Sequence, residues 1–288
     1  MNQSASGKRH VYTEFEETIE FTGKRYRVKL PWKEGEYEIP NNKELAEQRL
    51  SSLMKRLDKQ PDVLAEYDRI MKEQLASNII EPVDEKEKKE VHYLPHHPVV
   101  RESAETTKVR IVYDASAKAK KDDKSLNDCL HIGPSMTPLL YDVLLRMRAH
   151  PVILIADIEK LFLQIELDKG DRDYLRFLWF ENPTAVEREV KEYRYARVIF
   201  RAGPTPFLLC GTLKHHLKKY QDTDPEFVER LEKSLYVDDA VIGCDSVEDA
   251  IQMFEKAQIS FKEGGFTLRK WKSSNQEVRE DIREKKTT

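Results

Sequence analysis

The stretch that most constrains this chain is Leu235–Gly243, in which two adjacent aspartates interrupt an apolar run. Apolar residues precede Asp238 and Asp239, and a second apolar run closed by Gly243 follows them. This pattern predicts a β-hairpin whose strands are buried and whose turn carries both carboxylates. Because two carboxylates a few ångströms apart repel each other, the turn is either a solvated loop or the site of a divalent cation.

A third aspartate, Asp157, ends another apolar run far upstream. Residues 152–156 are apolar, contain β-branched side chains and follow Pro151, so they predict a strand buried on both faces. Apolar residues then alternate with others from Leu161 to Asp168, which predicts a second strand. Asp157 alone is explained equally well as a turn cap. Together with the two-aspartate hairpin, it fits a two-metal carboxylate clamp of the kind that joins nucleotides.

These and other motifs give the chain a resemblance to a known family. Ala156–Phe162 resembles the first palm motif of reverse transcriptases, and Tyr236–Asp239 resembles their Tyr-x-Asp-Asp box. The resemblance is closest to the BEL/Pao class of LTR retrotransposons in three further stretches, Tyr93–Val100, Asp114–Lys118 and Pro206–Leu209. It runs from about Lys24 to about Asn275, and the order and spacing of several motifs make it specific.

The resemblance implies an α+β fold, the fingers and palm of a right-hand polymerase. The palm is expected to be an antiparallel sheet with helices on one face. We expect residues 1–23 to form a polar segment, disordered at its start, and residues 24–150 to form a fingers-like region. Residues 151–288 are expected to form the palm, with the thumb absent or truncated.

The resemblance also implies roles at the carboxylate site. Asp157 and Asp238 would bind two Mg²⁺ ions, with Mn²⁺ as an alternative metal. The backbone carbonyl of Ile158 would add a ligand, and Asp239 would support the site as a further catalytic residue. Lys270 or Lys272 would protonate the leaving group, although surface lysines are equally expected at the end of a strand.

Substrate contacts are expected from both regions. Lys108 and Arg110 share one face of a predicted strand, which suits a triphosphate or an ordinary polar surface. The resemblance places Arg110 where the fingers hold the incoming nucleotide. Phe162 matches the ring that excludes a 2′ hydroxyl, although a core aromatic explains it equally well, and Phe200 completes the substrate-binding set.

One motif departs from the family pattern. Ile199-Phe200-Arg201 stands where this class usually carries Pro-Phe-Gly. Glycine lets the backbone lie close to the templating base, whereas arginine adds bulk and charge. Two hypotheses therefore stand: an RNA-directed DNA polymerase that transfers dNTP to a primer 3′ hydroxyl, and a catalytically weak retroelement remnant that acts as a nucleic-acid-binding or interaction module. An RNA-directed RNA polymerase palm is disfavoured by Phe162 and the fingers motifs.

Composition narrows the partners and the location. A net charge of −3 argues against a basic nucleic-acid coat, whereas residues 191–221 carry the local basic surplus that a groove needs. A solvated helix face explains part of this surplus equally well. The sequence has no apolar run of bilayer length and no signal peptide. The expected partners are an RNA or DNA template with primer, dNTPs and other polyprotein domains, with no membrane. The expected location is the cytoplasm, including a virus-like particle, with the nucleus as an alternative.

Other patterns predict scaffold. Residues 41–59 and 62–77 predict two amphipathic helices, and Thr137 begins another, with Leu139, Leu140, Val143, Leu144 and Met147 on its buried face. Ser246 and Asp249 predict the capped start of a helix that ends before Gly264. His96 and His97 are adjacent in an extended stretch, so they face opposite ways and are assigned structural roles.

Overall fold

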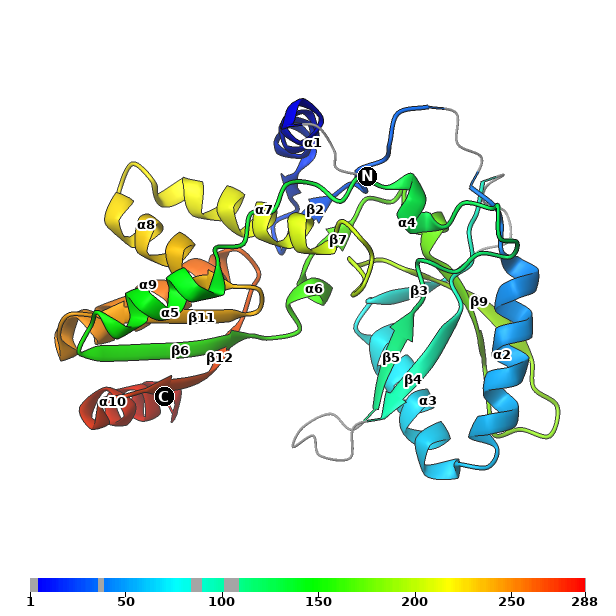
Figure 1. Cartoon of the computed structure of the whole chain (residues 1–288). Coiled ribbons are helices and arrows are strands. Elements are labelled where there is room, and N and C mark those ends of the chain that lie inside the picture. The colour runs from blue at the N-terminus through cyan, green and yellow to red at the C-terminus, as the bar shows by residue number, and fades with distance from the viewer. Residues whose placement is uncertain (1–4, 36–38, 84–89, 101–108, 288) are drawn as a thin grey trace. The chain divides into compact units, whose positions relative to one another are not determined.

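The computed structural model describes residues 5–35, 39–83, 90–100 and 109–287 (Figure 1). The chain is α+β and its sheets are small and antiparallel, as the sequence predicts. It divides into two compact units: the first comprises residues 1–27, 133–165 and 206–288, and the second comprises residues 28–132 and 166–205.

This division differs from the single boundary expected between residues 150 and 151. Residues 166–205 belong with the second unit because their strand β9 (Val190–Tyr195) pairs with β3 (Ile80–Pro82) and β8 (Arg176–Phe180). A sheet assembled from distant segments leaves no mark in the local sequence pattern, so a contiguous boundary was the simpler expectation.

The first unit contains both helices and strands. They are α1 (Ala5–Thr18), β1 (Glu20–Phe21), α5 (Leu140–Arg148), β6 (Val152–Ile158), α6 (Leu161–Gln164), most of α7 (Thr205–Leu217), η2 (Lys218–Tyr220), α8 (Pro225–Ser234), β10 (Leu235–Tyr236), β11 (Asp239–Cys244), α9 (Val247–Glu263), β12 (Leu268–Ser273) and α10 (Gln276–Thr287). Helices α8 and α10 were not predicted from the sequence. No helix in the described ranges is both long and apolar enough to cross a membrane.

The second unit holds two small sheets and the remaining helices. Its elements are α2 (Lys43–Leu57), α3 (Pro61–Ala76), β3, β4 (His96–Val100), β5 (Val109–Tyr113), α4 (Leu126–Cys129), β7 (Glu166–Leu167), η1 (Arg172–Leu175), β8 and β9, while β2 (Tyr26–Val28) crosses the unit boundary. The helix pair α2 and α3 confirms the two scaffold helices predicted for this region.

The main sheet of the first unit has the strand order β10-β11-β6-β12, and every pair is antiparallel. Burial alternates along β6, so that Leu154 and Ala156 are enclosed while Ile155 is 38% exposed. Helix α9 packs on this sheet, and its Phe254 meets Trp271 of β12 with ring centroids 4.9 Å apart. One face is thus covered by apolar side chains, and the face that carries Ile155 and Asp157 is more open.

Helix α9 begins where its cap was predicted. The Ser246 hydroxyl accepts a hydrogen bond from the backbone N–H of Asp249 at 3.1 Å. The helix ends at Gly264, and Gly265 follows with a φ of +80°. A side chain at Gly265 would place its Cβ 2.3 Å from the backbone oxygen of Lys24, so this sharp turn requires glycine.

The N-terminal segment is a helix where the sequence analysis expects a polar, disordered start. Val11 and Phe15 lie one helical turn apart in α1 and are 2% and 5% exposed. The Phe15 ring meets Phe207 of α7 edge to face, with centroids 5.3 Å apart. For the described part of residues 1–23 the expectation is therefore corrected: an apolar pair at i and i+4 gives the helix a buried stripe despite its polar composition.

Residues 161–168 form a helical turn and a short strand where one longer strand was predicted. The turn is α6, and only Glu166–Leu167 are extended. Leu161 and Ile165 are 2% and 0% exposed. Residues spaced by four lie on one face of a helical turn as well as on one face of a strand, so the alternation was ambiguous over so short a stretch.

Helix α5 exposes most of the face that was predicted to be buried. It begins at Leu140 and not at Thr137, and Val143 is its buried residue. Leu139, Leu140 and Leu144 are 70%, 46% and 41% exposed. The helix contacts β10 and β11, and that contact encloses only the side chain of Val143. Apolar periodicity predicted the helix correctly and its burial wrongly.

An aromatic cluster with one histidine forms the core of the second unit. His96 is 6% exposed, hydrogen-bonds the Tyr67 hydroxyl through Nδ1, and donates from Nε2 to the Leu178 carbonyl at 2.7 Å. Tyr67 stacks on Trp179 with centroids 4.6 Å apart. His97 is exposed on the opposite face of β4, so the predicted opposite facing of the two histidines and the structural role of His96 are confirmed.

The second unit also buries a group of charges that the sequence analysis missed. Asp173 is 1% exposed and accepts hydrogen bonds from Arg176 at 2.8 Å and from Arg194 at 2.9 Å. Burial acts to raise the pKa of Asp173, but the two guanidinium groups outweigh it and lower the pKa. Arg194 also binds Glu81 at 2.7 Å. These ion pairs join η1, β8, β9 and β3.

Candidate active site

Two of the three predicted carboxylates, Asp157 and Asp239, lie on adjacent strands of the main sheet, and Asp238 lies in the hairpin turn next to Asp239. In the β6–β11 pairing, Asp157 stands directly opposite Asp239. The backbone N–H of Ile158 donates to the carbonyl of Asp238 at 2.8 Å, which fixes the end of β6 against the hairpin. A strand and a hairpin are thus present at the predicted positions, and the register brings their aspartates together. Two details of the prediction are wrong: β6 is buried on one face only, since Ile155 is exposed, and Asp239 lies in strand β11, so the turn itself carries only Asp238.

The hairpin turn itself has an unusual backbone. Tyr236 pairs with Asp239, which leaves Val237 and Asp238 as a two-residue loop. Val237 has a φ of +56°, the sign that a type II′ turn requires at its first loop residue. A β-branched residue is disfavoured in this region, so the turn holds about 1–3 kcal/mol of strain beside the carboxylates.

The carboxylates influence one another electrostatically. Burial raises the pKa of Asp239, and the negative charges of Asp238 and Asp157 raise it further, while Lys270 lowers it. Two carboxylate neighbours that raise the same pKa mark a place where a cation would be stabilised.

The donor set suits a hard divalent cation. Carboxylate and carbonyl oxygens are the ligands of Mg²⁺ and Mn²⁺, and the mutual repulsion at Asp239 is of the kind a cation relieves. In the part of the chain that the structure describes, no group of three or more His, Cys, Asp or Glu side chains is arranged to hold a metal ion. Asp157 instead binds Arg269, whose Nε donates to Oδ1 at 2.7 Å. The oxygen atoms of these residues are chemically suited to bind a divalent metal ion. In the described arrangement, the Asp157 carboxylate is hydrogen-bonded to the guanidinium of Arg269.

Of the two lysines considered as general acids, one has a described contact with the carboxylates. Lys270 Nζ lies 4.0 Å from Asp157 Oδ2, whereas Lys272 pairs in register with Ile155. Both lysine side chains are exposed. Lys270 also has a φ of +52°, in the left-handed region.

The remaining predicted residues are distributed over both units. Ile158 is buried in β6, and Phe162 is half-buried in α6 of the same unit. Arg110 is exposed on β5 of the second unit, and Phe200 of that unit is 58% exposed. Lys108 lies outside the described residues. Asp157, Ile158, Asp238, Asp239 and Lys270 are therefore the predicted residues that one sheet brings close together, and Lys272 lies further along the same sheet.

Two residues at this site were missed from the sequence. Arg269 Nη1 donates to Glu159 Oε1 at 2.7 Å while its Nε holds Asp157. The available signal was a basic pair, Arg269 and Lys270, in a predicted strand. Its pairing with β6 is a long-range register that no local pattern encodes.

The position that departs from the family pattern has the backbone that glycine favours. Arg201 is exposed and has a φ of +74°. We expect Arg201→Gly to raise the free energy of unfolding by roughly 0.5–1 kcal/mol, because glycine reaches this region without steric cost. Urea unfolding measures the change. The control is Arg110→Gly, an exposed strand position without positive φ, which should lose stability; a loss at both positions would contradict the strain at Arg201.

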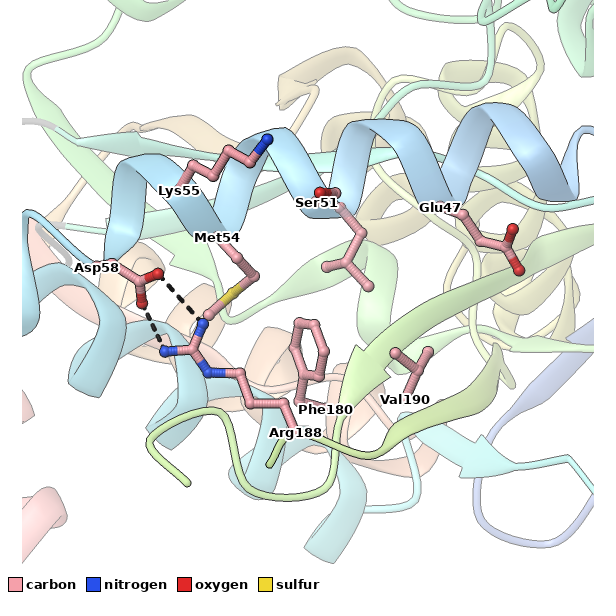
Figure 2. Close-up of a pocket in the computed structure, with 9 residues that line it drawn as sticks. Glu47, Ser51, Met54, Lys55, Asp58, Phe180, Arg188 and Val190 are labelled. Atoms are coloured by element: carbon pink, nitrogen blue, oxygen red, sulfur yellow. Dashed lines mark hydrogen bonds and ion pairs between the residues drawn. The ribbon is translucent and has the colours of Figure 1, made fainter. Parts of the chain in front are cut away.

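A shallow pocket of about 390 Å³ lies within the second unit, between α2 and the β8–β9 hairpin (Figure 2). Arg188 and Asp58 form an ion pair at one end, with Nη2 and Oδ1 2.6 Å apart. The lining residues are Glu47, Leu50, Ser51, Met54, Lys55, Asp58, Phe180, Arg188 and Val190. None of the predicted site residues lines this pocket.

Comparison with known proteins does not assign a family or a function to the carboxylate site. No protein-family model matches the chain, and no curated protein sequence matches it significantly. The resemblance described from the sequence therefore rests on the motifs of the chain itself.

Proposed function

We propose that the chain is the fingers and palm of an RNA-directed DNA polymerase of a BEL/Pao-class LTR retrotransposon. The observation that carries the proposal is the register of β6 and β11, which sets Asp157 opposite Asp239 beside the Asp238 turn. An antiparallel sheet with a helix-covered face and carboxylates on two adjacent strands suits a polymerase palm. In this proposal the first unit is the palm and the second supplies the fingers.

In this proposal, each residue of the carboxylate site has a separate role. Asp157 and Asp238, with the carbonyl of Ile158, would hold two Mg²⁺ ions. When bound, such ions acidify the primer 3′ hydroxyl and stabilise the charge of the leaving pyrophosphate. Asp239 adds negative charge without being a required ligand, and Lys270 would hold the proton that the leaving group takes.

The proposal gives three further predicted residues a role in nucleotide binding. Arg110 is exposed and always charged, so it can bind a triphosphate with two parallel hydrogen bonds. Phe162 would contact the sugar, and Phe200 would contact the nucleotide or template. Partners in this proposal are a template with its primer, dNTPs and other domains of the same polyprotein.

Primer extension tests the proposal. The purified chain with Mg²⁺, a poly(rA) template and an oligo(dT) primer should add dTTP, and the same reaction without divalent cation should not. Absence of extension, with primer–template binding retained, would favour the second candidate.

That second candidate is a weakly active remnant that binds nucleic acid. The left-handed backbone at Arg201 favours it, because the residue at this place is not the glycine that its conformation prefers. Arg201→Gly combined with Ile199→Pro distinguishes the candidates. Faster extension than in the parent supports a decayed polymerase, and slower extension with weaker template binding makes Arg201 a template contact.

Phe162 gives a prediction about sugar selection. Phe162→Ala should raise the ratio of ribonucleotide to deoxyribonucleotide incorporation at least about fivefold, because it opens space for a 2′ hydroxyl and such steric discrimination is worth about 1–3 kcal/mol. Single-nucleotide extension with rTTP and dTTP gives the ratio. Leu163→Ala, the next residue of the same helix, is the control. A variant that adds dTTP with an unchanged ratio would make Phe162 a packing residue only.

A further inference from the structure

Arg269 bridges two carboxylates at the open face of the sheet. It stands opposite Asp157 in the β12–β6 pairing. Its Nε donates to Asp157 Oδ1 at 2.7 Å and its Nη1 donates to Glu159 Oε1 at 2.7 Å. The side chains of Arg269, Asp157 and Glu159 are 37%, 27% and 35% exposed. All three are therefore reached by solvent and by ions.

The backbone of β12 is distorted where it presents this cation. In a regular strand, successive side chains point to opposite faces, so Arg269 and Lys270 could not both approach Asp157. Here the register shifts between Arg269 and Lys272, and Lys270 has a φ of +52°. As a result Asp157 has Arg269 at Oδ1 and the Lys270 ammonium 4.0 Å from Oδ2. Bulges of this kind re-aim side chains, and strain that persists beside a site is a mark of function.

Stability alone accounts poorly for this arrangement. An ion pair that is about one-third exposed contributes little to folding, whereas a left-handed non-glycine residue costs free energy. The balance of positive and negative charges at the site explains the distorted strand and its cations better than folding stability does. Asp157, Asp238 and Asp239 lie together, and a positive group at Asp157 offsets their repulsion when no metal is bound.

We infer that Arg269 is a built-in counter-cation, which occupies Asp157 in the metal-free protein and releases it to a divalent cation. This inference rests on the proposed function. Arg269 Nε and a metal ion need the same carboxylate lone pairs of Asp157, so the two compete. When the hydrogen bond from Nε to Asp157 breaks, the hydrogen bond from Nη1 to Glu159 keeps the guanidinium beside the site. Arg269 thus sets the cation concentration at which the site fills, and it acts as a positioning residue.

The test is direct cation binding without nucleic acid. Mn²⁺ is titrated into the full chain, and free Mn²⁺ is followed by its electron paramagnetic resonance signal. Arg269→Met removes the competing charge and keeps an apolar stem, so it should bind Mn²⁺ at least about fivefold more tightly than the parent. Arg269→Gln, which retains a donor for Asp157 without charge, should shift binding in the same direction.

Arg279→Met is the matched control. Arg279 lies in α10 and donates to the backbone carbonyl of Ser273 at 2.9 Å, so this variant loses the same charge without freeing a carboxylate. Its affinity should equal that of the parent. Unchanged or weaker Mn²⁺ binding in Arg269→Met and Arg269→Gln, with binding intact in the parent, overturns the counter-cation role alone. A parent without saturable Mn²⁺ binding overturns the metal site and the proposed function with it.

Discussion

Replacing Asp157 or Asp238 by asparagine is expected to reduce nucleotide addition by about a thousandfold, because in the proposed polymerase each variant loses a charged metal ligand worth several kcal/mol of transition-state stabilisation. Asparagine keeps the size and hydrogen-bonding ability of the side chain. Single-turnover primer extension at saturating dTTP measures the loss, and circular dichroism checks that the fold is retained.

Two further variants separate a metal role from a general loss of charge. Asp239→Asn should lose less, since the proposal gives Asp239 only a supporting role and burial and its acidic neighbours already raise its pKa. Asp222→Asn removes an exposed carboxylate of the same unit and should leave extension unchanged. Near-parental turnover in either Asp157→Asn or Asp238→Asn would end the two-metal assignment.

The sequence was sufficient where structure is determined locally. The Asp238 hairpin, strand β6 and the Ser246 cap each depend on a few consecutive residues, and all three occur at the predicted positions, although β6 is buried on one face only. Turn residues, helix caps and short apolar runs determine structure over a few consecutive residues, so they can be recognised in the sequence without knowing the rest of the fold.

The sequence was insufficient where distant segments meet. Nothing local shows that Arg269 faces Asp157, or that Arg194 reaches Asp173 and Glu81. Both depend on strand registers set by the whole sheet. The exposure of Leu140 in α5 has the same origin, since a helical stripe is buried only if another element covers it.

The second large effect concerns acid stability, and it follows from the burial of His96. Burial lowers the pKa of His96 from 6.5 to about 4. Between these values the unfolded chain binds a proton that the folded chain does not, so the free energy of unfolding falls as the pH drops from 6.5 to 4. Above pH 6.5 the contribution is fully present, and a difference of this size corresponds to roughly 3 kcal/mol.

Urea unfolding at pH 7 and pH 4.5, followed by the fluorescence of Trp179 beside this cluster, measures the loss. His96→Gln can still accept from Tyr67 and donate to Leu178 but cannot titrate, so its loss on acidification should be smaller than that of the parent by roughly 2–3 kcal/mol. His92 and His216 also have pKa values lowered by burial, and they act equally in parent and variant. His97→Gln removes a more exposed histidine on the opposite face and should keep most of the parental loss. Equal losses of unfolding free energy in the parent and in His96→Gln would contradict this prediction. They would mean that His96 is protonated as readily in the folded protein as in the unfolded chain. The enclosure of His96 by Tyr67, Leu178 and the aromatic rings argues against that outcome.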